Sequence, residues 1–219
     1  MKTILSFLTV SLIFISGCDR QMPVGDDQSI VGYQIRGKVT DRIGNPIDSV
    51  VVILDYNADI VPGSAVSRQY FVADTTGLIQ ADVADPNNNI IVVLTSPRKV
   101  FGFFQATWNG DDSTGNVAPS GIYQVRYLVN GRVVYSYNQL VSGGVVALTG
   151  PDGRFTIPGR YLPIDSTSVP YFSANDSSYL GNLHIANDVV LTFVYSSHFR
   201  QVEQALDLGL VTVIDVMFN

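Results

Sequence analysis

The chain has 219 residues and a formal net charge of −6, a length that suits one large or two small domains. It contains only 13 lysine and arginine residues, whereas proteins that bind nucleic acid need such cations to displace counterions from phosphates. The composition therefore argues against a nucleic-acid partner. The sequence also contains no basic stripe that would indicate binding to anionic lipid headgroups.

The choice of residue types favours strands over helices. Glu203 is the only glutamate among 19 acidic residues, and the only lysines are Lys2, Lys38 and Lys99. Glutamate and lysine favour helices, whereas aspartate favours turns and caps. The 11 Tyr, 11 Phe and many Val and Ile residues favour strands, and 19 Gly with 10 Pro supply turns. We therefore predict an all-β fold.

The N-terminus is organised like an export signal. A positive charge at Lys2 precedes an apolar run at Ile4–Ser16, which fits the hydrophobic region of a secretory signal and is too short to cross a bilayer as a helix. The run ends in Ile15-Ser16-Gly17-Cys18. This sequence resembles the lipobox, the cleavage site of bacterial lipoproteins.

The lipobox resemblance implies cleavage between Gly17 and Cys18 and attachment of a lipid to the Cys18 thiol. Cys18 is the only cysteine, so lipidation would also remove an unpaired thiol from an exported chain. The alternative is an ordinary secretory signal with a chance cysteine. Because acyl chains anchor a protein firmly, we expect a lipid-anchored protein of the bacterial cell envelope, with the outer membrane or cell surface favoured over the inner membrane.

Residues 1–17 are thus predicted to be a signal peptide and residues 18–33 a lipidated flexible tether. The tether is polar, contains Pro23, Gly25 and Gly32, and has no hydrophobic period. A flexible segment of this length reaches roughly 20 Å, which would hold a folded domain just clear of the headgroups.

Apolar segments predict strands along the rest of the chain. We expect a half-exposed strand at Ile35–Thr40 and strands buried on both faces at Val50–Leu54 and Ile90–Leu94. Tyr70–Val72 and Leu78–Val83 are predicted to pair as a hairpin around the intervening Asp-Thr-Thr-Gly turn. Further strands are expected at Phe101–Trp108, Val145–Leu148, Phe155–Ile157, Val189–Tyr195 and Leu208–Phe218.

The strongest local signal is the pair Asn130-Gly131. Residues 122–129 alternate between apolar and polar before it, and residues 133–137 alternate after it. A type I′ turn needs positive φ at both central positions, which Asn-Gly supplies. The sequence therefore predicts a β-hairpin closed by these two residues.

Two segments are predicted to be irregular or helical. Asp165–Ser178 is rich in Ser and Asp, which is typical of a long loop. Arg200–Leu206 is the only helix candidate, and a turn between two strands is the alternative.

One set of motifs resembles the carboxypeptidase regulatory-like domain. The matching segments are Ile35–Asp41, Gly44–Ile47, Val50–Leu54, Thr149–Ile157, Asp188–Tyr195 and Leu206–Phe218. The resemblance implies a transthyretin-like β-sandwich with a backbone turn at Gly153. It is a resemblance to the accessory sandwich of those proteins and not to a zinc enzyme.

A second motif lies between the two halves of the first. Trp108–Asp112, Gly115 and Val117–Tyr123 resemble the Ig-like domain of the flagellar hook-capping protein, although Asn109 stands where that family usually has Asp. The resemblance implies that Trp108 fills the core of the sandwich. It also implies that Pro119-Ser120-Gly121 turns the chain into the next strand.

The order of the motifs predicts that one sandwich is inserted into the other. We expect an Ig-like domain at residues 59–143 within a carboxypeptidase regulatory-like sandwich formed by residues 34–58 and 144–219. Surface loops tolerate such insertions. The alternative is two sandwiches in tandem, with Asp74–Leu78 as the turn that closes the first.

The sequence contains no catalytic motif. Neither His184 nor His198 lies three residues before Glu203, so the common zinc-binding patterns are absent, and there is no G-x-S-x-G sequence. We expect His184 at a strand edge and His198 in a solvated turn. A Ser-His-Asp triad assembled from distant residues stays open. We predict no enzymatic activity, no cofactor and no metal.

Three other groups of residues are candidate binding sites. The oxygens of Asn109, Asp111, Asp112 and Asn116 suit Ca²⁺, but we expect them to satisfy backbone groups of a turn. The pair Arg98-Lys99 is expected to be a solvated corner. The third group is a run of tyrosines, Tyr123, Tyr127, Tyr135 and Tyr137, which we expect to pack in the core and not to form a platform for sugar rings.

Two functions remain. The favoured one is a non-catalytic envelope protein in which tethered β-sandwiches act as a spacer, scaffold or adhesion module with a protein partner. The alternative is a carbohydrate- or peptide-binding module, for which the loops at 109–116 and 165–178 are the candidate sites. The first function predicts buried Tyr and Phe side chains, and the second predicts at least two exposed coplanar rings beside a polar loop.

Overall fold

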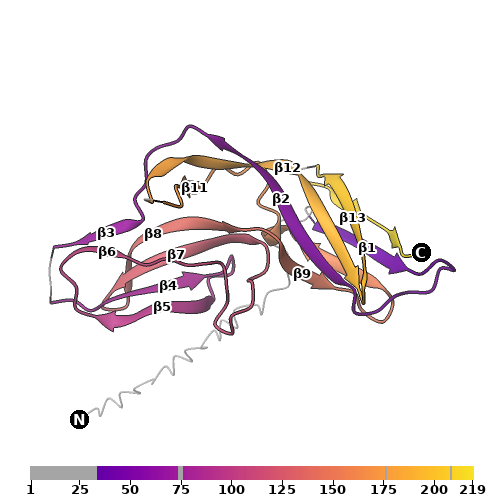
Figure 1. Cartoon of the computed structure of the whole chain (residues 1–219), viewed down its shortest axis with the longest axis horizontal. Helices are drawn as coiled ribbons and strands as arrows, with labels where there is room; N and C mark the ends of the chain where they lie inside the picture. Colours follow the sequence, from indigo (N-terminus) through magenta and orange to yellow (C-terminus); the bar gives the residue numbers. More distant parts are fainter. Residues whose placement is uncertain (1–33, 74–75, 176, 208) are drawn as a thin grey trace, which may run out of the picture. The chain divides into compact units, whose positions relative to one another are not determined.

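Alternation of Val, Ile, Tyr and Phe with polar residues places most of the chain in strands (Figure 1). The structure, a computed structural model, describes residues 34–73, 76–175, 177–207 and 209–219. Within these ranges the only helical element is the short 3₁₀ turn η1 (Gly159–Tyr161), and no helix could span a membrane. The all-β prediction is confirmed.

The strands form two β-sandwiches, which we call sandwich 1 and sandwich 2 in the order in which they begin along the chain. One sheet of sandwich 1 contains β10 (Arg154–Pro158), β1 (Gln34–Thr40), β14 (Val211–Val213) and β15 (Val216–Met217). Its other sheet contains β11 (Val169–Phe172), β12 (Tyr179–Tyr195), β2 (Val51–Val61), β9 (Gly144–Leu148) and β13 (His198–Ala205). Strand β12 is long enough to pair with β11 at one end and with β13 at the other.

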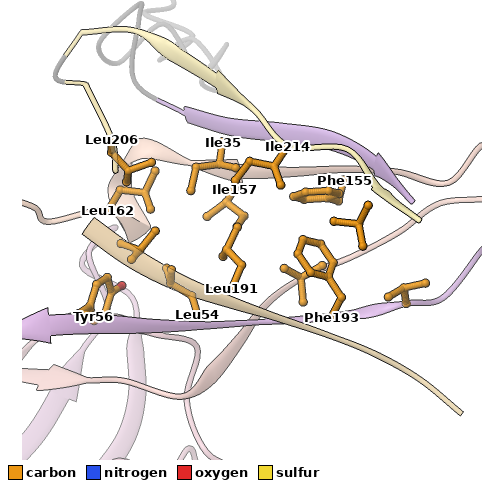
Figure 2. Close-up of a cluster of buried hydrophobic side chains, with 14 of the residues drawn as sticks. Ile35, Leu54, Tyr56, Phe155, Ile157, Leu162, Leu191, Phe193, Leu206 and Ile214 are labelled. Carbon is orange, nitrogen blue, oxygen red and sulfur yellow. The ribbon is translucent and has the colours of Figure 1, made fainter. Parts of the chain in front are cut away.

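Alternate side chains of both sheets fill the core of sandwich 1, as Figure 2 shows. Ile35 from β1 and Ile157 from β10 face Leu191 from β12, and all three are fully buried. The rings of Phe155 and Phe193 meet edge to face with centroids 5.3 Å apart. Such burial contributes roughly 1.5–3 kcal/mol for each large apolar side chain.

Gly37 explains how the C-terminal strands join this sheet. Strand β1 pairs in parallel first with β14 and then with β15, and the chain between them brings the Ile214 carbonyl against β1. A Cβ on residue 37 would lie 1.7 Å from the Ile214 oxygen, so only glycine fits there. Next to it the Asp215 carboxylate accepts a 2.9 Å hydrogen bond from the Lys38 N–H.

Sandwich 2 consists of a two-stranded and a four-stranded sheet. The small sheet pairs β3 (Gln69–Val72) with β6 (Gly102–Gln105). The larger sheet has the order β5 (Ile90–Arg98), β4 (Ile79–Ala84), β7 (Gly121–Val129), β8 (Arg132–Val141). Trp108 fills the core between them, with its ring 5.0 Å from that of Tyr123 and its indole N–H bonded to the Asp111 carbonyl at 2.6 Å.

All strands of sandwich 2 lie in sequence between β2 and β9, and β2 and β9 are neighbours in sandwich 1. Sandwich 2 therefore occupies a connection of sandwich 1. Strand β2 runs to Val61, three residues beyond the predicted boundary at residue 58. The assignment of the two sandwiches to the carboxypeptidase regulatory-like and Ig-like families stays a prediction.

The hairpin predicted at Asn130-Gly131 is confirmed. These residues have φ of 49° and 77°, as a type I′ turn requires, and Val129 pairs with Arg132 across the turn. The face expected to be apolar is buried at Tyr123, Val125 and Tyr127, but burial does not alternate along the whole strand, because Arg126 and Leu128 on the other face are buried as well.

Two strand predictions in sandwich 2 are wrong. Tyr70–Val72 does not pair with the strand at 78–83, because β3 pairs with β6 while β4 lies between β5 and β7. This arrangement lets Tyr70 stack on Tyr135, with ring centroids 6.0 Å apart. The strand at 90–94 is not buried on both faces, since β5 is an edge strand with Ile90 and Val93 more than half exposed.

The remaining corrections concern lengths and element types. Arg200–Leu206 lies mostly in strand β13, which is held to β12 at eight consecutive positions, so it is neither a helix nor a turn. The expected loop at 165–178 contains β11, and the expected strand at 101–108 shortens to β6. The expected strand at 208–218 is interrupted at Ile214-Asp215, and the outer face of 50–54 is only half-buried at Val51 and Ile53.

Candidate functional site

The predicted lipid-attachment site lies outside the described residues. Gly17, Cys18, the signal peptide at 1–17 and the tether at 18–33 all precede Gln34, where the described part begins. Their roles therefore stay predictions.

The two histidines lie on separate strands. His184 is in β12, half-exposed, with its Nε2 atom 4.0 Å from the Asp165 carboxylate, which is longer than a hydrogen bond. His198 is exposed at the first position of β13, just after the turn at Ser196-Ser197. In the described ranges, no three His, Cys, Asp or Glu side chains gather as a metal site would require.

The loop at 109–116 uses its polar side chains to hold its own backbone. Asp112 accepts hydrogen bonds from the Thr114 hydroxyl (2.7 Å), the Thr114 N–H (2.8 Å) and the Asn116 N–H (3.1 Å). These bonds, the hydroxyl bond first, lower the pKa of Asp112. Asn109 and Asp111 are likewise bonded to each other. The prediction that these residues satisfy a turn is confirmed.

The same five-residue turn occurs at three places in the chain. The sequences are Asp41–Asn45, Asp85–Asn89 and Asp112–Asn116, and in each the first N–H bonds to the carbonyl of the fifth residue. The fourth residue has positive φ in each case, and the aspartate accepts the N–H of the third and fifth residues. Three of the 19 acidic side chains therefore serve the local structure of turns.

The tyrosines of the β7–β8 hairpin pack in the core. Tyr123, Tyr127 and Tyr137 are 5 % exposed or less, and burial raises the pKa of each. The hydroxyls of Tyr123 and Tyr127 donate to the carbonyls of Pro119 and Arg68 at 2.7 and 2.6 Å. Tyr135 is half-buried and stacks on Tyr127 at 5.8 Å. The core prediction is confirmed for the three buried rings.

Three exposed phenylalanines were missed by the sequence analysis. Phe71 on β3 and Phe103 on β6 pair with each other and are 53 % and 70 % exposed, and Phe101, just before β6, is 71 % exposed. The rings of Phe71 and Phe103 meet at 63° with centroids 5.3 Å apart. The signal that could have revealed them is alternation, because Phe104, between Phe103 and Gln105, is the residue that points into the core.

A buried ion pair also escaped the sequence analysis. Asp82 on β4 lies opposite Arg126 on β7, with Arg126 Nε 2.7 Å from Asp82 Oδ1. Arg126 also donates to Asn88 Oδ1 at 2.7 Å, while the second oxygen of Asp82 has no hydrogen-bond partner. The pair lies on the face of the larger sheet that points away from Trp108, where it links β4 to β7.

The two larger hollows found on the described part of sandwich 1 are the remaining candidate sites. One of about 560 Å³ lies against β1 and β10 and is lined by Arg36, Lys38, Arg154 and Asp215. Lys38 and Arg154 are direct partners in the β1–β10 register, so two like charges face each other. The other, of about 380 Å³, lies beside His198 and Phe218 and is more apolar.

No family model, curated protein or solved structure matches the chain.

Proposed function

We propose that this protein is a lipid-anchored, non-catalytic component of a bacterial cell envelope in which two joined β-sandwiches act as a rigid spacer. The observation that carries the spacer role is the joint between the sandwiches, which is built of buried hydrogen bonds and a shared aromatic contact. The anchor rests on the lipobox resemblance at Cys18.

The first part of the joint is centred on Ser120. This side chain is fully buried, and its hydroxyl donates to the Leu54 carbonyl of β2 and accepts the Gly144 N–H of β9 at 2.7 Å. Gly144 permits this approach, since a Cβ there would lie 2.2 Å from the Ala118 oxygen. Buried polar contacts of this kind fix one geometry, because breaking them leaves unsatisfied groups.

The second part of the joint is Phe172. It belongs to β11 of sandwich 1 but is buried in the core of sandwich 2, with its ring 5.8 Å from that of Tyr137. The Arg68 guanidinium lies 4.4 Å above the same ring, a favourable cation–π arrangement. Asn138 adds a 3.2 Å hydrogen bond to the Ser168 carbonyl. Contacts at two separate places, Ser120 and Phe172, restrict rotation of one sandwich relative to the other more than a single contact would.

The anchor is tested by the intact mass of protein extracted from membranes. We expect a mass for residues 18–219 plus acyl chains, and loss of both cleavage and membrane retention in Cys18→Ala. If Cys18→Ala is still cut at Gly17-Cys18 and still partitions into detergent, the anchor proposal is wrong.

The spacer is tested by distance distributions between spin labels on Ser113→Cys in sandwich 2 and Thr156→Cys in sandwich 1, both exposed positions. We expect a narrow distribution that broadens in Phe172→Ala. Phe199→Ala, which truncates an exposed ring on β13, is the control and should leave the width unchanged. A broad distribution in the otherwise unaltered chain would contradict the spacer role.

The alternative, a carbohydrate-binding module, has less support. A sugar-binding platform needs coplanar exposed rings, whereas the predicted tyrosines are mostly buried and the exposed Phe71 and Phe103 rings meet at 63°.

A further inference from the structure

One end of sandwich 2 combines exposed aromatic rings with positive charge. We call this surface the Phe–cation tip, and it consists of Phe71, Phe101, Phe103, Arg98, Lys99 and Arg132, all of them exposed. Aromatic rings of this size each carry roughly 200 Å² of surface, so the three rings expose roughly 400 Å² of apolar area. That area is in the range of the largest apolar patch of a typical monomer, which is often functional.

Strand register brings these residues together. Ile79, the first residue of β4, pairs with Arg98 on one side and with Val129 on the other. Val129 in turn pairs with Arg132 across the hairpin turn, so Arg98 and Arg132 flank the same end of the sheet. Phe101 is two residues after Lys99 in the sequence. The Arg98 guanidinium lies 5.7 Å from the centre of the Phe104 ring.

Among the described residues, no carboxylate lies close to the positive charge at this end; Asp74, two residues after β3 in the sequence, lies outside them. Asp85 follows the other end of β4, and Asp111 and Asp112 lie beside it, because the Ser113 N–H bonds to the Ile91 carbonyl at the start of β5. Asp82 is buried against Arg126. The sequence predicts a solvated corner at Arg98-Lys99, and both side chains are exposed; strand pairing adds Phe71, Phe103 and Arg132 to the same end of the sandwich.

We propose that the Phe–cation tip docks on the surface of an anionic lipid bilayer, with the phenylalanine rings inserted among the acyl chains and the cations held at the phosphates. Aromatic and basic side chains on one surface are the combination that binds such interfaces. This contact is distinct from the predicted anchor at Cys18. The anchor would raise the local concentration of bilayer around the tip, but the contact does not depend on it.

Two other occupants fit the tip less well. A second copy meeting tip to tip would place the cations of both copies beside each other, which like-charge repulsion disfavours. A polysaccharide would need coplanar rings, and Phe71 and Phe103 are tilted by 63°. Complementarity of charge therefore favours the anionic bilayer.

The test places a fluorescent label at Ser96→Cys, an exposed position on β5 two residues before Arg98. The full chain is reconstituted in phosphatidylcholine vesicles, with or without phosphatidylglycerol, that carry a lipid-bound quencher. A matched reporter at Ser113→Cys lies at the opposite end of sandwich 2. Where Cys18 is not acylated, Cys18→Ser keeps the label unique. Intact mass of the same sample reports the anchor separately, so failure of the tip and failure of the anchor are distinguishable.

We expect phosphatidylglycerol to increase quenching at residue 96 and not at residue 113. The double variant Phe101→Ser, Phe103→Ser should abolish that increase, whereas Phe199→Ser, which removes an equally exposed ring from sandwich 1, should not. Arg98→Gln and Lys99→Gln should each weaken docking about fivefold and reduce its salt dependence. Fluorescence of Trp108, buried in the same sandwich, confirms that each variant is folded.

Three results would overturn the proposal. Quenching at residue 96 that is the same with and without phosphatidylglycerol would exclude an anionic bilayer as the partner. An equal loss in Phe199→Ser would show that the effect is not local to the tip. Quenching that follows the number of protein molecules per vesicle, and not the lipid composition, would assign the tip to contact with a second copy.

Discussion

Loss of the Arg126 side chain should destabilise sandwich 2 strongly. Arg126 Nε lies 2.7 Å from Asp82 Oδ1, with side chains only 9 % and 1 % exposed. At that distance the gross attraction is about 6 kcal/mol for an effective dielectric constant of about 20. In Arg126→Met, the Asp82 carboxylate stays buried without its cation, and removing one partner of such a pair costs about 3–5 kcal/mol.

Urea unfolding followed by tryptophan fluorescence measures this loss directly. Trp108 is the only tryptophan and lies in the core of sandwich 2, so its signal reports the sandwich that contains the pair. Arg154→Met is the control, because Arg154 and Asp152 form a 3.4 Å pair with side chains 76 % and 65 % exposed and such pairs contribute at most about 1 kcal/mol. Because Arg154 lies in sandwich 1, far-UV circular dichroism, which reports both sandwiches, is recorded in the same urea titrations.

The double variant Asp82→Leu, Arg126→Met separates a net attraction from the cost of an unpaired charge. Replacing both partners by apolar groups is often close to neutral, so the double variant should regain most of the stability lost in Arg126→Met. The reasoning fails if Arg126→Met loses less than about 1 kcal/mol, or if the double variant is as unstable as the single one.

Three further outcomes are expected. Because the pKa of Asp112 is lowered from its ordinary value of 3.8, its hydrogen bonds stabilise the folded state at pH values above 3.8, and this stabilisation is lost as pH falls through the lower folded-state pKa. The difference in stability between the unaltered chain and Asp112→Ala should therefore shrink on acidification. A difference in urea midpoints that stays constant with pH would contradict this. Gly144→Ala should lower stability by about 1–3 kcal/mol because its methyl would lie 2.2 Å from a backbone oxygen, while Gly150→Ala, with its closest neighbour at 3.4 Å, should not; thermal unfolding decides. Phe193→Ala should cost about 3–5 kcal/mol and Phe199→Ala less than about 0.5 kcal/mol by far-UV circular dichroism in urea, and similar losses would mean that burial does not govern these two sites.

Local signals in the sequence predicted the parts of the fold that depend on neighbours. The Asn130-Gly131 turn was predictable because two adjacent residues determine its dihedral angles and its register. The hairpin expected between 70–72 and 78–83 was wrong although its turn sequence was favourable. Strand β3 finds its partner thirty residues further along the chain in β6, and no local pattern encodes that choice.

The secondary-structure propensity of single residues also failed to predict elements that are formed by pairing with distant strands. Arg200–Leu206 contains residues that favour helices, yet β13 follows the long strand β12 through a tight turn at Ser196-Ser197 and pairs with it throughout. Backbone hydrogen bonds to β12 therefore outweigh the local preference of each residue. The Ser-rich composition of 165–178 concealed β11 in the same way, since Val169–Phe172 is a short run between polar flanks.

The Phe–cation tip was harder to predict than the fold, because it consists of large aromatic side chains that are exposed where burial is expected. Alternation along 101–105 places Phe104 in the core and Phe101 and Phe103 outside it, so the pattern was present in the sequence. An aromatic residue in a strand is normally taken as core, and that assumption hid the patch. Its cations come from β5 and from the β7–β8 hairpin, which only the sheet order brings together.

The net charge of the chain is a poor guide to its partner, because charge is separated along sandwich 2. Strand β4 spans six residues, roughly 20 Å at about 3.3 Å per residue, with Arg98 beside its first residue and Asp85 after its last. The Debye length at physiological ionic strength is about 8 Å, so a surface in contact with one end responds to the charges of that end alone. The carboxylates of Asp85 and Asp112 at the other end also accept hydrogen bonds from the backbone N–H groups of their turns. An acidic chain can therefore present a locally cationic, aromatic tip to an anionic surface, and adding salt should weaken that contact even though the whole protein and the surface carry charge of the same sign.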